Sequence, residues 1–156
     1  MEKRLHKVVV SGLLSLAVMV SACGGGADEA AAPAAAEHAH TAPHGGTLVE
    51  LGDHLASLEV VHTPATGMLV IYVLDGEAQG SVRIAQTSLT VHIEGDSPRT
   101  VELLPVASSL TGETSGDASQ FSRSLDVLKG AVTSVRVQEL VVKGQTFRDV
   151  AINLAR

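Results

Sequence analysis

Residues 68–74 read MLVIYVL, an apolar run that is rich in β-branched side chains and long enough for one strand. Because both sets of alternating positions are apolar, we expect a central strand that is covered on both faces. Asp75 and Gly76 follow immediately and predict a turn. The rest of the domain is therefore expected to pack around residues 68–74.

The neighbouring segments predict an all-β domain, because short apolar runs alternate with clusters of Gly, Asp, Pro and Ser. Two β-rich runs near the C-terminus flank a turn at residues 143–145, which predicts a hairpin. About seven or eight strands favour a small antiparallel β-sandwich of the immunoglobulin-like kind. The expected strands are residues 47–51, 54–62, 68–74, 88–94, 100–106, 120–122, 133–142 and 146–154, with a short piece at 82–84 and a helical turn within 124–129.

The N-terminus has the pattern of a secretory signal peptide over residues 1–22. Three basic residues precede an apolar stretch at residues 8–20, which is too short to cross a bilayer. The following Val-Ser-Ala-Cys, ending at Cys23, resembles the lipobox of bacterial lipoproteins. The resemblance implies that a diacylglycerol is attached to the Cys23 thiol. Since Gly24 rather than Asp follows, we expect a lipid anchor in the outer membrane, facing the periplasm.

The mature chain is expected to consist of a flexible, disordered tether at residues 23–43 and a domain at residues 44–156. The tether is rich in Ala, Pro and Gly and has no apolar periodicity. Without residues 1–22, the chain keeps eight basic and sixteen acidic residues, a balance that repels nucleic acid and attracts cations. Plain solubility would also explain this charge. One Tyr, two Phe and no Trp leave few platforms for stacking bases or sugars, so we expect no nucleic-acid partner.

Histidines are the candidate metal ligands, because an acylated Cys23 leaves the domain without a thiol. His38, His40 and His44 lie within seven residues, and imidazole is a common ligand of Zn²⁺, Cu²⁺ and Ni²⁺. His54 could join them, because a hairpin turn at Gly52 and Asp53 would bring it back to His44. We therefore predict a site for one of these ions made by the three clustered histidines, with His54 as a fourth ligand. The alternative is that the histidines of the tether are simply solvated.

Glu59 and His62 are further candidates on the expected strand 54–62. Glu59 lies on the face opposite Leu58, where it could pair with an arginine or accept a metal ion. His54 and His62 would be about 26 Å apart along a straight strand, too far to share an ion. Each of these histidines could instead cap the core at a sheet edge.

Three blocks of sequence carry a family resemblance: PHGGTLVELG at residues 43–52, LEVVH at 58–62 and VIYVLDG at 70–76. Together they resemble small secreted bacterial PHGG-type lipoproteins of uncharacterised role. More distantly, they are similar to the N-terminal periplasmic domain of heavy-metal efflux adaptors of the cobalt-zinc-cadmium type. The resemblance implies a periplasmic β-sandwich with a role in metal handling, and it carries over to His44, Glu59 and His62. Related sequences often have histidine where this chain has Ser57, which argues against a site on that strand alone.

Motifs of common enzyme classes are missing from the sequence, including H-E-x-x-H, C-x-x-C, G-x-S-x-G and a phosphate-binding loop. Asp53, Asp75 and Glu77 fall at expected turns, where turn chemistry explains them. We expect a non-enzymatic lipoprotein that binds or buffers divalent transition metals. The alternative is an interaction module that docks on another cell-envelope protein, such as a metal efflux complex.

Overall fold

The computed structural model describes residues 40–154, and these residues form antiparallel strands with one short 3-10 helix, so the all-β prediction is confirmed. The predicted signal peptide, Cys23 and most of the predicted tether lie outside the described residues. No helix among residues 40–154 is long and apolar enough to cross a membrane. The elements are β1 (Thr47–Leu51), β2 (Ala56–Thr63), β3 (Met68–Asp75), β4 (Leu89–Gly95), β5 (Arg99–Pro105), β6 (Gln120–Ser124), η1 (Asp126–Leu128), β7 (Val132–Val142) and β8 (Gln145–Asn153).

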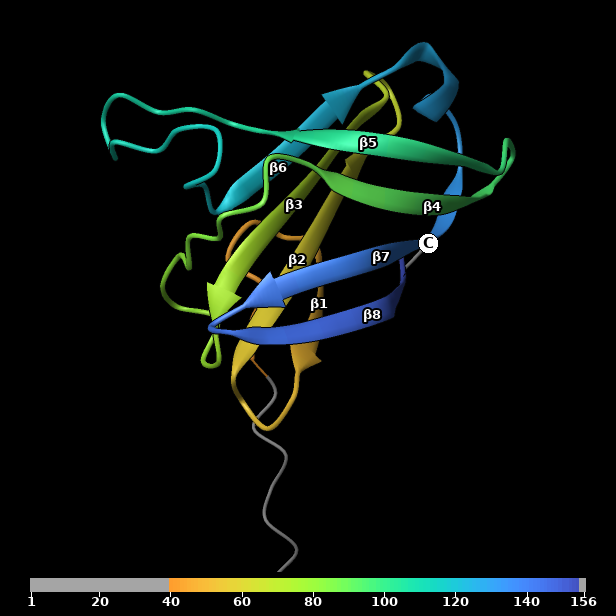
Figure 1. The fold of residues 1–156 in the computed structure, drawn as a ribbon. Coiled ribbons are helices and arrows are strands. Elements are labelled where there is room, and N and C mark those ends of the chain that lie inside the picture. The colour runs from red at the N-terminus through yellow and green to blue at the C-terminus, as the bar shows by residue number, and fades with distance from the viewer. Residues whose placement is uncertain (1–39, 155–156) are drawn as a thin grey trace, which may run out of the picture. The chain divides into compact units, whose positions relative to one another are not determined.

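The eight strands form one sheet in the order β1-β2-β3-β6-β5-β4-β7-β8. In Figure 1, β4, β5, β7 and β8 run across β1, β2 and β3, so the sheet is folded over on itself. The two halves are joined where β5 pairs with β6 at Leu104 and Pro105. The edge strands β1 and β8 also approach each other, which nearly closes the sheet. The two layers expected of a sandwich are therefore made by a single continuous sheet.

The core lies between the two halves and follows the period of two that strands impose. Leu69, Ile71 and Val73 of β3 point into it, and Phe121 of β6 is fully buried beside them. Val70 and Leu74 on the opposite face of β3 are also buried, as expected for a central strand. The half-buried pattern predicted for residues 88–94 is observed, because β4 buries Leu89, Val91 and Ile93 and leaves the alternate positions more exposed.

Two expected elements differ from the prediction. β2 begins at Ala56 rather than at His54, because His54 has a positive φ of 50° in the turn before the strand. The short piece at residues 82–84 forms only an isolated bridge from Ile84 to Ala118, and Ser81 just before it forms another with Leu74. The helical turn within residues 124–129 is present as η1.

The outer face of β2 is unusual for a sheet because its polar side chains are buried. Ser57 and Glu59 both have an exposed fraction of 0%. Residues 40–46 help to cover this face of β2, since His44 and Gly46 both donate hydrogen bonds to the Glu59 carboxylate. Glu59 and His44, two of the candidate functional residues, meet on this face.

Candidate metal centre

Two of the predicted ligands, His40 and His54, lie together, and Glu77 completes a group of three. One ligand atom from each residue lies within 4.8 Å of the other two. Nδ1 of His40 is 3.8 Å from a carboxylate oxygen of Glu77. The His40 and His54 rings meet edge-on, with centroids 5.7 Å apart and planes at 86°. Within the described residues 40–154, His40, His54 and Glu77 are the group that could hold a metal ion.

Contact between two turns brings His54 and Glu77 to the same place. His54 lies between β1 and β2, and Glu77 follows β3. β2 and β3 pair with Ala56 opposite Asp75, so both turns lie at one end of this strand pair. The turns pack closely: a Cβ built on Gly76 would come within 1.9 Å of the His54 carbonyl oxygen. Only glycine fits at this position, and the pairing of the strands therefore brings His54 and Glu77 together.

His40 is the most buried of the three ligands, with 12% of its side chain exposed. Its Nε2 is buried and has no hydrogen-bond partner among the described residues. A buried polar atom without a partner is unfavourable by about 1–3 kcal/mol. The approach of His40 to Glu77 is made through the other ring nitrogen, Nδ1.

The three side chains are close to metal-binding geometry without being fixed in it. Metal–ligand bonds of about 2.0–2.2 Å in a tetrahedral site place ligand atoms roughly 3.3–3.6 Å apart. His54 and Glu77 have side chains that are 45% and 67% exposed, so both can rotate inward. Two imidazoles and one carboxylate suit Zn²⁺, Cu²⁺ or Ni²⁺ and leave at least one coordination position for water or another ligand.

Glu50 of β1 lies beside His54. Its carboxylate accepts a hydrogen bond of 2.8 Å from the His54 backbone N–H. The same oxygen lies 3.5 Å from His54 Nδ1. A carboxylate beside one ring nitrogen favours the proton there and directs the other nitrogen toward a metal ion. Glu50 and Glu77 also supply negative charge beside the imidazoles, which favours a cation.

His44, another predicted ligand, is not a member of this group, because Glu59 engages it. The backbone N–H groups of His44 and Gly46 donate to one Glu59 oxygen at 2.8 Å each. His44 Nδ1 lies 2.7 Å from the other oxygen. Within residues 40–154, Glu59 thus pairs with neither an arginine nor the candidate metal group, and its buried carboxylate is compensated by the segment at residues 40–46.

Tyr72 of β3 completes the surroundings of His44. The two rings are stacked, with centroids 3.7 Å apart and planes within 5° of parallel. Tyr72 lies directly opposite Glu59 in the pairing of β2 with β3. Burial raises the pKa of the Tyr72 hydroxyl, and the negative charge of Glu59 raises this pKa further. Tyr72 therefore stays neutral at physiological pH and presents its ring to His44 as a flat apolar surface.

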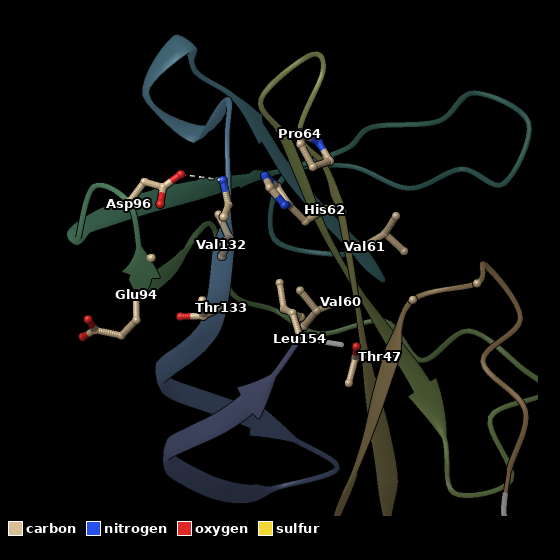
Figure 2. Close-up of a pocket in the computed structure, with 14 residues that line it drawn as sticks. Thr47, Val60, Val61, His62, Pro64, Glu94, Asp96, Val132, Thr133 and Leu154 are labelled. Atoms are coloured by element: carbon tan, nitrogen blue, oxygen red, sulfur yellow. Dashed lines mark hydrogen bonds between the residues drawn. The ribbon is translucent and has the colours of Figure 1, made fainter. Parts of the chain in front are cut away.

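His62 lies apart from both arrangements, in the groove shown in Figure 2. The groove has a volume of about 870 Å³ and is lined on one side by β2 and on the other by residues around Val132. His62 Nε2 is 2.8 Å from the Leu128 carbonyl oxygen, and Asp96 accepts a bond from the Ala131 N–H. Because these polar groups are already bonded within the domain, the groove offers less metal chemistry than the His40 group.

Glu77 is the member of this group that sequence reasoning missed, since it was explained as a turn residue. The sequence does contain a signal for it. If residues 64–67 form the turn of a hairpin, pairing the two flanking strands outward from this turn places Ala56 opposite Asp75. Residues just before Ala56 and just after Asp75 must therefore share one end of the sheet. The remaining predicted ligand, His38, lies outside the described residues. Comparison with protein-family models, curated proteins and solved structures finds no match.

Proposed function

We propose that this chain is a lipid-anchored, extracytoplasmic protein that binds or buffers a divalent transition metal ion through His40, His54 and Glu77. The anchor and the compartment rest on the signal pattern and on Cys23. Metal binding rests on one observation, the convergence of two imidazoles and a carboxylate within 4.8 Å from three separate parts of the chain. No enzymatic step is part of this proposal.

The donor set and its exposure favour reversible binding. Three protein ligands leave room for water or an incoming ligand, and two of the three side chains are substantially exposed. An ion held in this way can be exchanged with a partner, as metal buffering requires. Without residues 1–22 the chain has eight basic and sixteen acidic residues, and the resulting net charge of −8 favours accumulation of cations around it.

The test is calorimetric titration of the full-length chain, purified in detergent, with Zn²⁺, Cu²⁺ and Ni²⁺. We expect saturable binding that is lost in the triple variant His40→Ala, His54→Ala, Glu77→Gln. His92→Ala is the matched control, because His92 bonds to Thr100 and Gln138 on the opposite half of the sheet.

Unchanged binding in the triple variant would reject the site. If the triple variant loses binding, His38→Ala decides whether the predicted histidine of the tether contributes a fourth ligand. A chain that binds none of the three ions would favour the second function predicted from the sequence, an interaction module that docks on another cell-envelope protein.

A further inference from the structure

The segment that carries His40 is fastened to the sheet by a buried carboxylate. Glu59 accepts hydrogen bonds from the His44 and Gly46 backbone amides, and its second oxygen lies against the His44 imidazole. The His44 ring then stacks on Tyr72. We call Glu59, His44 and Tyr72 the clasp.

Burial of Glu59 and attachment of the segment are a single event. A carboxylate with an exposed fraction of 0% is strongly unfavourable unless hydrogen bonds compensate it. The hydrogen bonds that Glu59 accepts within the described residues all come from residues 44 and 46. If this segment lifts from the sheet, all three contacts are lost together and the carboxylate is hydrated. The segment therefore behaves as a two-state element.

The position of His40 depends on this element. His40 precedes His44 by four residues, a span of at most about 14 Å. Its observed neighbours, His54 and Glu77, belong to turns of the folded sheet. A lifted segment would carry His40 away from them, whereas a fastened segment holds it in place.

We infer that Glu59, His44 and Tyr72 are positioning residues for metal binding, and that an ion bound by His40, His54 and Glu77 in turn holds the segment at residues 40–46 on the sheet. This inference rests on the proposed function. Because the coupling is reciprocal, the clasp strengthens metal binding by the same factor by which metal stabilises the clasp. The bound ion thus fixes the start of the domain at the point where the predicted tether reaches it.

The first test compares zinc affinity in the full-length chain. We expect His44→Ala and Tyr72→Leu each to weaken zinc binding by about fivefold or more, within the usual range of coupling between sites. His92→Ala is the control and should bind zinc as the unaltered chain does. Wild-type affinity in both clasp variants would overturn the inference.

The second test needs no altered clasp and measures hydrogen exchange of the His44 and Gly46 amides. At a free zinc concentration 100 times Kd, exchange of both amides should slow by about 100-fold if only the fastened state binds the ion. The slowing should be absent in His40→Ala. Exchange that zinc leaves unchanged in the unaltered chain would also overturn the inference.

The two proposals fail in different ways. If the triple variant of the metal ligands still binds zinc normally, the metal site itself is wrong. If the triple variant loses binding while the clasp variants keep it, the metal site stands and only the coupling is wrong.

Discussion

Replacing Glu59 by leucine tests the energetic role of the buried carboxylate. Exchanging a buried ion pair for apolar side chains is often neutral or stabilising, because both charges disappear. Here two of the donors are backbone N–H groups of His44 and Gly46, which the substitution cannot remove. Each donor left without an acceptor is unfavourable by about 1–3 kcal/mol. The segment at residues 40–46 can lift into water, where both donors are hydrated, and this limits the loss. We therefore expect Glu59→Leu to lower the free energy of unfolding by about 3 kcal/mol.

Glu59→Gln separates the charge from the hydrogen bonds. Glutamine keeps an oxygen for the two amides, and its NH₂ group can donate to His44 Nδ1, so we expect a smaller loss of about 1.5 kcal/mol. Urea denaturation followed by circular dichroism measures both variants, and the slope of each transition shows whether unfolding remains two-state. Glu102→Leu, at an exposed position of β5, is the control and should stay within about 0.5 kcal/mol of the unaltered chain. A Glu59→Leu variant as stable as the unaltered chain would refute the reasoning.

Three further predictions concern the loop glycines, a loop carboxylate and metal loading. Gly46→Ala should destabilise the domain by more than about 2 kcal/mol in thermal unfolding, because the new Cβ would lie 2.4 Å from the Val60 carbonyl oxygen. Gly45→Ala, which has a φ of 73° but open space around it, should lower stability by only about 1 kcal/mol. Hydrogen bonds from Ser119 and Thr111 lower the pKa of Glu113, so the stability that this group contributes is present above its unfolded pKa and is lost as the pH falls through the folded value. Glu113→Gln should therefore lower stability at pH 7 by about 1 kcal/mol, a small value because the carboxylate is partly exposed, and in urea titrations the difference should shrink as the pH falls through the lowered pKa of Glu113. Zinc at 100 times Kd should raise the free energy of unfolding by about 2.7 kcal/mol in the same assay, and His54→Ala should abolish this gain.

The strands were predictable because their cause is local. Alternation of Leu89, Val91 and Ile93 with polar residues, and the doubly apolar run at residues 68–74, follow from which faces are buried. The continuity of the sheet was not predictable in this way. It depends on the short pairing of Leu104 and Pro105 with β6, which alternation along either strand does not specify.

The candidate site was only half predictable from the sequence. His40 and His54 were identified because imidazoles are recognisable ligands wherever they lie. Their partner Glu77 depends on contact between two turns, and a turn carboxylate has an adequate local explanation without any ligand. His44 resembles a ligand by residue type, yet its role is decided by Glu59, which lies 15 residues away in the sequence and becomes its neighbour only after β2 is covered.

The separation of the three ligands along the chain distinguishes a site of the fold from a site of the tether. A histidine-rich tether would bind an ion equally well in the folded and the unfolded chain, and such binding cannot stabilise the fold. His40, His54 and Glu77 meet only when β2 and β3 are paired and when residues 40–46 lie on the sheet. An ion bound by these three residues therefore favours the folded domain over the unfolded chain, by an amount that grows with the ratio of the free ion concentration to Kd. Stabilisation by metal, rather than binding alone, is accordingly the property that identifies this arrangement.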